Sequence, residues 1–221
     1  FVVKDATPRP DLEAAMLTLV NAERANARHR PPPADRLILS APAVWGWSHQ
    51  PLPYKTTLWF AANLTGSKVY TPPRWLTRRV APTDNREELI AMGRDPLMVW
   101  GARSDTLYGL VAMMERAWTK VGAVQAPVLY LYGANDQIIP ETPSTEAAGK
   151  LKPTDRSAYY DKGWHLLTRD RQGPVVWGDI LSFVIDPAAP LPSGAPPIPG
   201  APTLPNSART AERATDPRAG L

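Results

Sequence analysis

The sequence contains no cysteine, which excludes disulfide bonds, thiol nucleophiles and metal sites built on cysteine. It also lacks any apolar run near the roughly 18 residues that a membrane-spanning helix requires. We expect at most peripheral contact with a membrane, and a cytoplasmic or peripheral membrane location. The chain begins at Phe1 rather than methionine, which is consistent with a fragment or a trimmed product.

Strong charge is also missing, because the formal net charge is only +4. Residues 187–221 hold three arginines and two acidic residues, a balance of 3 − 2 = +1, so the rest of the chain carries +3. This mild excess argues against nucleic acid as a partner. Hydrophobic residues at 43% and charged residues at 21% are ordinary for a globular protein. The oligomeric state leaves no signal in the sequence.

Proline, in contrast, is abundant, with 26 residues, many of them near the C-terminus. From Pro187 the composition changes abruptly to the run PAAPLPSGAPPIPGAPTLP. A segment so rich in proline, alanine and glycine has little side chain to bury, so it is predicted to be extended or disordered. Residues 187–221 are therefore assigned no fold and no catalytic role.

The stretch from Val128 to Pro140 organises the rest of the sequence. Residues 128–132 form an apolar, aromatic run bounded by Pro127 and Gly133, which predicts a buried strand. Gly133 permits a sharp turn after it. Asp136 then falls just past the carboxyl end of the strand, the edge where open α/β sheets place their chemistry.

A second strand, about 157–160, is followed in the same way by Gly163 and then by His165. Neighbouring parallel strands would bring both loops to one edge, where Asp136 would hold His165 in one tautomer and stabilise its protonated form. That arrangement is two-thirds of a nucleophilic triad. The alternative is that Asp136 is an ordinary turn residue hydrogen-bonded to its own backbone, and that His165 is a structural or an exposed histidine.

Further elements follow from apolar periodicity and from capping residues. Helices are predicted at about 11–28, 85–93, 104–121 and 174–186, and a further strand at 37–41. The interval 45–124 is too long for a structureless loop, so it is interpreted as a lid or cap. Its tryptophans and methionines suit an apolar substrate, although for most of them the better interpretation is the cap's own core. The organisation is therefore 1–44 partial core, 45–124 cap, 125–186 core and 187–221 tail.

Several stretches together resemble the α/β-hydrolase superfamily, and more narrowly the monoacylglycerol lipase and lysophospholipase group of bacteria. They are LILSAPAVWG (37–46), NREELIAMGRDPLMVW (85–100), DTLYGLVAMMERA (105–117), PVLYLYGANDQIIP (127–140) and YYDKGWHLLTRDRQGPVVWGDILSFV (159–184). The resemblance implies the C-terminal part of a parallel α/β-hydrolase sheet with an inserted, mainly helical cap. It also implies a serine hydrolase of acyl esters or lipids, with Asp136 as the triad acid, His165 as the triad base, and no metal or cofactor.

The sequence departs from this family at the nucleophile. The family places a serine in a GxSxG turn ahead of strand 37–41, and no GxSxG occurs in the chain. The nearest match is Gly46-Trp47-Ser48-His49-Gln50, which lacks the second glycine and follows the strand, so Ser48 is interpreted as an ordinary loop serine. The early oxyanion turn and the first four or five strands of the family fold are also absent. The chain alone is expected to be inactive.

Three functions remain open at this point. The first is a lipase or lysophospholipase that is complete only with residues outside this chain. The second is a non-catalytic pseudo-hydrolase or lipid-binding module. The third keeps the fold but uses an aspartate nucleophile, as in dehalogenase or epoxide-hydrolase relatives, and the lipase-like cap stretches argue against it.

Overall fold

The computed structural model describes residues 35–72 and 80–203. Nearly all of them belong to one compact unit that begins at Arg36. The helix predicted at 11–28 and Trp75 lie outside the described residues. Within the described part, no helix is both long enough and apolar enough to cross a lipid bilayer.

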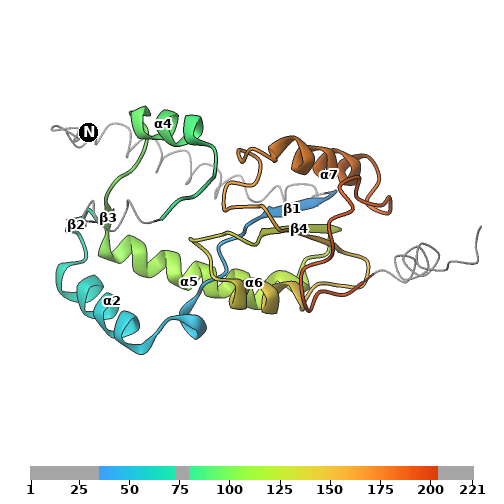
Figure 1. Cartoon of the computed structure of the whole chain (residues 1–221). Helices are drawn as coiled ribbons and strands as arrows, with labels where there is room; N and C mark the ends of the chain where they lie inside the picture. The colour runs from blue at the N-terminus through green and yellow to red at the C-terminus, as the bar shows by residue number, and fades with distance from the viewer. Residues whose placement is uncertain (1–34, 73–79, 204–221) are drawn as a thin grey trace, which may run out of the picture. The chain divides into compact units, whose positions relative to one another are not determined.

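A three-stranded parallel sheet forms the centre of this unit (Figure 1). Its strands are β1 (Leu37–Ser40), β4 (Val128–Gly133) and β5 (Arg156–Tyr160), in the order β1-β4-β5. Leu37 lies opposite Val128, and Leu129 lies opposite Arg156. The three predicted strands are confirmed, and their parallel pairing brings the three carboxyl ends to one edge of the sheet.

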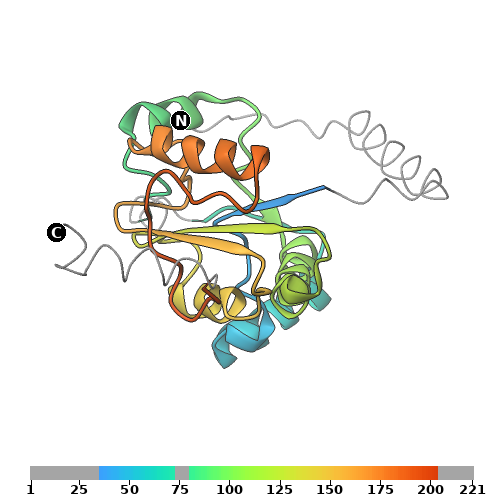
Figure 2. The ribbon, with the colours of Figure 1, turned by 90° about the vertical axis from the view of Figure 1, so that its right-hand side faces the viewer.

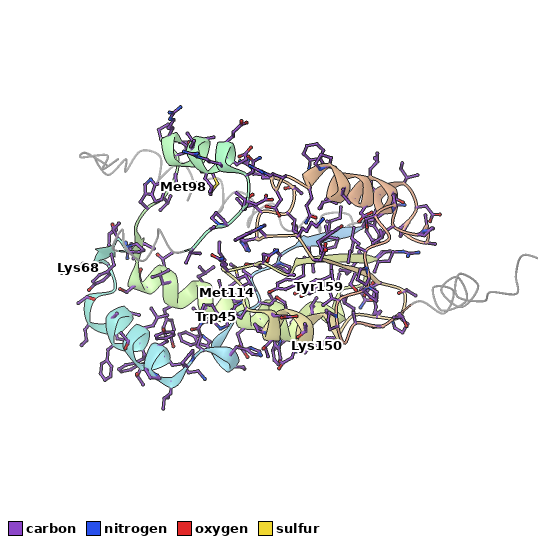
Figure 3. All side chains as sticks on the ribbon, viewed as in Figure 1. Trp45, Lys68, Met98, Met114, Lys150 and Tyr159 are labelled. Atoms are coloured by element: carbon purple, nitrogen blue, oxygen red, sulfur yellow. The ribbon has the colours of Figure 1, made fainter. Side chains whose placement is uncertain are left out.

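Strand β4 is buried along its whole length because it is the central strand. Its side chains alternate between two apolar clusters, as the pleat of a strand requires. Val128, Tyr130 and Tyr132 pack with α6 (Glu141–Ala148) on one face. Leu129 and Leu131 pack with α7 (Gly173–Ile185) on the other face, and Figure 2 shows the sheet between these two helices. Trp45, labelled in Figure 3, and Trp118 pack against the edge of the first cluster.

The interval 45–124, called the insert from here on, joins the adjacent strands β1 and β4. It contains η1 (Trp47–His49), α2 (Leu52–Thr65), α4 (Arg86–Arg94), α5 (Ser104–Lys120) and η2 (Val121–Ala123). Two-residue strands β2 (Val69–Tyr70) and β3 (Ala102–Arg103) pair with each other and not with the central sheet. The helices predicted at 85–93 and 104–121 are confirmed, and α2 is an additional helix.

The expectation that the insert's aromatic side chains form its own core is wrong. None of the insert's five described tryptophans is fully buried, and Trp59 and Trp100 are exposed. Helix α2 buries no side chain at all. Helix α5, although it packs on α2, buries only Ser104. The insert therefore presents an apolar surface within the described part of the chain, whereas strand β4 of the sheet is buried along its whole length.

The prediction for the proline-rich segment also needs correction over residues 187–203. This segment forms no helix or strand, as predicted, but it packs against the outer edge of β5. Ile198 is only 1% exposed and joins the first apolar cluster. The Tyr159 amide donates to the Pro196 carbonyl over 2.8 Å, and the Ser193 amide donates to buried Asp179 over 2.8 Å. Composition alone missed this packing because a few scattered apolar side chains, Leu191, Ala195, Ile198 and Ala201, and a few backbone groups provide it.

Candidate active site

The loop after β4 is shaped around the carboxylate of Asp136. One oxygen, Oδ1, accepts hydrogen bonds from the backbone amides of Ile138 and Ile139 at 2.8 and 2.9 Å. The Tyr132 hydroxyl closes the same loop by donating to the Ile139 carbonyl over 2.8 Å. Burial, with the nearby charges of Asp136 and Glu141, raises the pKa of Tyr132, so this hydroxyl keeps its proton. Asp136 is thus a turn residue in part, and its second oxygen remains available.

Two glycines allow the loops after β4 and β5 to approach each other closely. A Cβ on Gly133 would collide with the Gly163 carbonyl, and a Cβ on Gly163 would lie 2.9 Å from the Gly133 Cα atom. The Asn135 amide donates to the Gly163 carbonyl over 2.8 Å, which fastens one loop to the other. The repeated strand–glycine pattern in the sequence therefore reflects a direct backbone contact.

This contact places His165 beside Asp136. The His165 Nδ1 atom lies 2.9 Å from Asp136 Oδ2. The Asp136 side chain is 0% exposed, and the His165 side chain is 21% exposed. An ionised carboxylate can only accept hydrogen bonds, so a neutral His165 ring in this position carries its proton on Nδ1 and presents a lone pair at Nε2. Nε2 makes no hydrogen bond within the described part of the chain. The geometry suits a general base that is oriented by a buried acid.

Ser48 occupies a different environment. Its hydroxyl and its amide both donate to the carboxylate of Glu115 on α5, the amide over 2.9 Å. The neighbouring His49 lies 2.8 Å from Glu146 through Nε2 and meets the ring of Trp118 edge-on. Ser40 is the last residue of β1 and is exposed. Among the described residues, no serine is hydrogen-bonded to His165.

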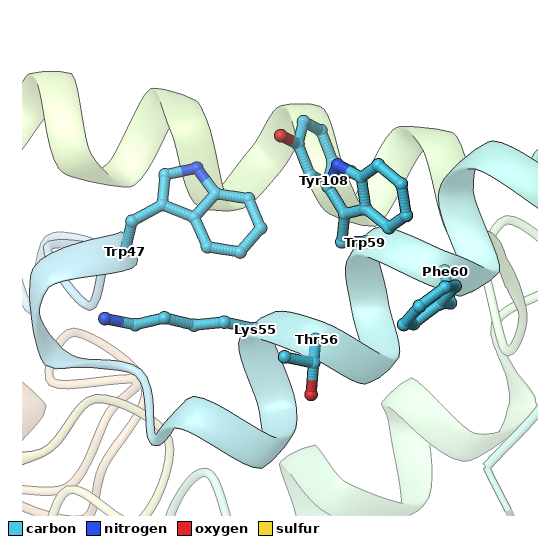
Figure 4. A pocket seen from close by; sticks show the side chains of 6 residues that line it. All are labelled: Trp47, Lys55, Thr56, Trp59, Phe60 and Tyr108. Carbon is cyan, nitrogen blue, oxygen red and sulfur yellow. The ribbon is translucent and has the colours of Figure 1, made fainter.

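An aromatic pocket of about 290 Å³ lies between η1, α2 and α5 of the insert. Figure 4 shows the rings of Trp47, Trp59 and Tyr108 around it, with the stem of Lys55 along one side. The rings of Trp47 and Tyr108 are 4.8 Å apart between centroids. No residue of the Asp136 or His165 loops lines this pocket. Its walls favour an apolar group, with one cation beside it.

Sequence reasoning missed one buried polar group beside the pair, because nothing in its spacing indicates it. Asp170, five residues after His165, accepts hydrogen bonds from Thr83 of the insert and from the amide of Trp164. Thr83 and Asp170 are 87 positions apart in the sequence. In residues 35–72 and 80–203, no group of three or more acidic or histidine side chains is placed to hold a metal ion.

Comparison with known proteins agrees with this architecture. The sequence matches the family described as serine aminopeptidase, S33, over residues 20–172, which is more than half of the chain. A sequence search among proteins of curated function finds no significant match.

Two solved structures are similar in fold. The monoacylglycerol lipase of Paleococcus ferrophilus is 22% identical with a TM-score of 0.58, over 72% of this chain and 62% of that protein. A soluble variant of monoglyceride lipase from Saccharomyces cerevisiae, solved with a substrate analogue, is 14% identical with a TM-score of 0.53. That match covers 67% of this chain and 54% of the yeast protein. The chain thus spans less than two thirds of the length of either lipase. The parallel sheet, the strand-end loops and the family match together show that this chain belongs to the serine aminopeptidase S33 family of α/β hydrolases.

Proposed function

We propose that this chain supplies the acid, the base and the substrate-covering insert of a carboxylic-ester hydrolase of the monoacylglycerol lipase or lysophospholipase type. The observation that carries the proposal is the hydrogen bond between His165 Nδ1 and buried Asp136, which leaves Nε2 free to take a proton. The substrate would be an acyl ester or lipid, and no cofactor is required for this chemistry.

The proposed reaction follows the steps of acyl transfer through a serine. His165 Nε2 removes the proton from a serine hydroxyl while that oxygen attacks the ester carbonyl. The ester C–O bond then breaks, and the leaving oxygen departs as an alcohol with the proton that His165 returns to it, while the acyl group stays on the serine. Water, activated in the same way, then releases the carboxylic acid. Asp136 stabilises the protonated imidazole at each step, and the serine comes from residues outside this chain.

The exposed apolar surface of the insert supports a lipid-like substrate. The pocket walled by Trp47, Trp59 and Tyr108 has room for part of an acyl chain, and an apolar lining favours such a group through its removal from water. In this proposal the insert acts as the lid of the enzyme.

A second candidate function is lipid binding without catalysis. It is favoured by one specific observation: Ser48, the serine of the only GxSxG-like stretch, is bonded to Glu115 rather than to His165. In this case Asp136 and His165 would serve only to hold the two loops together.

Hydrolysis assays on two polypeptides separate these candidates. One is the present chain, and the other is the chain extended upstream of Phe1 in its reading frame. Substrates are p-nitrophenyl esters of increasing acyl length, a monoacylglycerol, and an aminoacyl p-nitroanilide that tests for peptidase activity. We expect ester hydrolysis only by the extended protein, with a preference for the longer acyl chains.

Matched variants of the extended protein locate the base. Asp136→Asn is expected to lower kcat by about 10⁴-fold and His165→Ala by at least as much, whereas His49→Ala should leave it near wild type. Folded extended protein that hydrolyses no ester would refute the enzyme proposal and favour the binding function. If the present chain hydrolyses esters and His165→Ala abolishes this activity, the nucleophile lies within the chain. The Ser48→Ala variant would then test whether Ser48 is that nucleophile.

A further inference from the structure

Asp170 is a buried carboxylate that takes no part in the Asp136–His165 pair. It is 4% exposed, and each of its oxygens accepts one hydrogen bond. Oδ2 accepts from the backbone amide of Trp164 over 2.7 Å, and Oδ1 accepts from the hydroxyl of Thr83 over 2.6 Å. The second distance is typical of a charge-assisted hydrogen bond. The carboxylate therefore joins the residue that precedes His165 to a residue of the insert.

The backbone on the other side of His165 is also bonded to the insert. The amide of Leu166 donates to the carbonyl of Pro82 over 2.9 Å. Both sequence neighbours of His165 are thus fixed through their amides, one by Asp170 and one by Pro82. Thr83, which is 1% exposed, is itself held in place because its Oγ1 also accepts the Asn85 amide over 3.2 Å.

Contacts around this centre extend the connection. The Asn85 side chain donates to the Arg169 carbonyl over 3.1 Å, and the Arg171 amide donates to Asp84 over 2.9 Å. The Ala81 amide donates to the side chain of Gln137, which follows Asp136, over 2.9 Å. One short segment of the insert, residues 81–85, is therefore hydrogen-bonded both to the loop that carries Asp136 and to the loop that carries His165.

We propose that Asp170 and Thr83 are positioning residues, which fix the backbone around His165 so that its ring faces Asp136 and which make this geometry depend on segment 81–85 of the insert. The inference rests on the proposed role of His165. If the insert moves when substrate binds, the movement would change the position of His165 through Pro82 and Thr83. Neither of these two residues needs to contact the substrate.

The electrostatics of Asp170 agree with this role. Burial raises the pKa of Asp170, and the charges of Asp84 and Asp136 raise it further, while the hydrogen bonds from Thr83 and Trp164 oppose the rise. The hydrogen bonds from Thr83 and Trp164 therefore stabilise the ionised form of the buried Asp170 carboxylate. Loss of either donor leaves a carboxylate oxygen without a partner, which is costly in the interior of a protein.

Selective ¹⁵N labelling of histidine tests the proposal on the whole chain, because the chain has only 3 histidines. Thr83→Val removes the hydroxyl and keeps the shape of the side chain, and Thr83→Ser restores the hydroxyl. Thr119→Val makes the same change at an exposed site on α5, and Asp136→Asn is the reference for a broken pair. These spectra report the tautomer of the His165 ring, and hydrogen exchange of the Trp164 and Leu166 amides is measured on uniformly ¹⁵N-labelled protein.

In the wild type we expect a single His165 tautomer with the proton on Nδ1. Thr83→Val should give a mixture of tautomers, approaching the Asp136→Asn spectrum, and should speed exchange of both amides by about tenfold, because the hydroxyl that hydrogen-bonds both Asp170 and the Asn85 amide is lost. Thr83→Ser and Thr119→Val should match the wild type. A rescue by serine separates positioning from the mere filling of space.

A folded Thr83→Val chain with an unchanged His165 tautomer and unchanged amide exchange would overturn the proposal. Should Thr83→Val fail to fold, Asp170→Asn tests the same link, because it keeps the size of the side chain and one acceptor oxygen. An unchanged His165 ring in that variant would equally overturn it. None of these readouts needs enzyme activity, so failure of the ester-hydrolase proposal and failure of this inference give different results.

Discussion

The sheet core and the insert differ in how far they bury a phenylalanine side chain, as Phe183 on α7 and Phe60 on α2 show. Phe183 is 0% exposed and packs against β4 and β5, whereas Phe60 is 56% exposed. The core is held together by burial of apolar area, which is the dominant favourable contribution to folding. The insert is held by helix packing and by polar links such as those from Ser48 to Glu115. Its apolar surface thus remains available to another molecule or to another part of the protein.

The largest expected effect tests this difference directly. Phe183→Ala should lower the free energy of unfolding by about 3–5 kcal/mol, because it leaves a cavity between α7 and the sheet. Phe60→Ala should change it by less than about 1 kcal/mol, as is usual for exposed positions. Denaturant unfolding of both variants gives the comparison. Equal losses would mean that the insert has a core of its own in solution.

A pair of glycines sharpens the comparison at the level of the backbone. Gly133→Ala should destabilise the fold by about 1–3 kcal/mol, the range for overpacking, because the new Cβ collides with Gly163 backbone atoms. Gly109→Ala, within α5, meets no atom within 4 Å and should stabilise the protein by about 0.5–1 kcal/mol. Thermal melting of the two variants should therefore shift in opposite directions. A harmless Gly133→Ala change would show that the two strand-end loops are farther apart than the structure has them.

The smallest expected effect concerns acid pH and the insert alone. Burial would raise the pKa of Glu115, but the two hydrogen bonds from Ser48 hold it below its ordinary value. A carboxyl with a lowered pKa in the folded state contributes stability above its ordinary pKa of 4.5, and this contribution is lost as the pH falls through the lowered pKa.

Amide hydrogen exchange measured on both sides of that range checks this prediction. Exchange at residues 47–49 should accelerate at acid pH relative to the intrinsic rate, while exchange in β4 should not. Glu115→Gln should remove the acid-induced change. A pH dependence that persists in Glu115→Gln would contradict this assignment.

Much of the fold could be predicted because the sheet obeys local rules. β4 is a continuous apolar run between a proline and a glycine, and α4 follows the N-cap residue Asn85, whose side chain accepts the Glu87 amide. Helix α2 was not predicted because it starts at Pro51-Leu52-Pro53 and has apolar residues on all sides, which weakens the helical periodicity of its sequence. Helix α6 was not predicted because it is short and contains Pro143 among threonines and a serine. Such elements depend on tertiary packing more than on their own sequence.

The candidate site likewise contains residues that the sequence predicts and residues that it does not. Asp136 and His165 could be paired from the sequence because each follows a strand and a glycine, and parallel strands bring such loops together. Asp170 and Thr83 could not, because their contact spans 87 positions and depends on the path of the insert. The sequence shows which loops meet at the edge of a sheet. It does not show which part of a long insert returns to them.

The proline-rich segment that lies along β5 has a practical consequence for anyone who shortens this protein. Composition suggests a cut after Asp186, where the low-complexity run begins. That cut would remove Ile198 from the apolar interior and the Pro196 carbonyl from the Tyr159 amide. The outer strand would then offer unpaired backbone groups to other molecules, a common cause of aggregation. A C-terminal boundary beyond Thr203 keeps this cover, and poor solubility of a shorter fragment would reflect its loss.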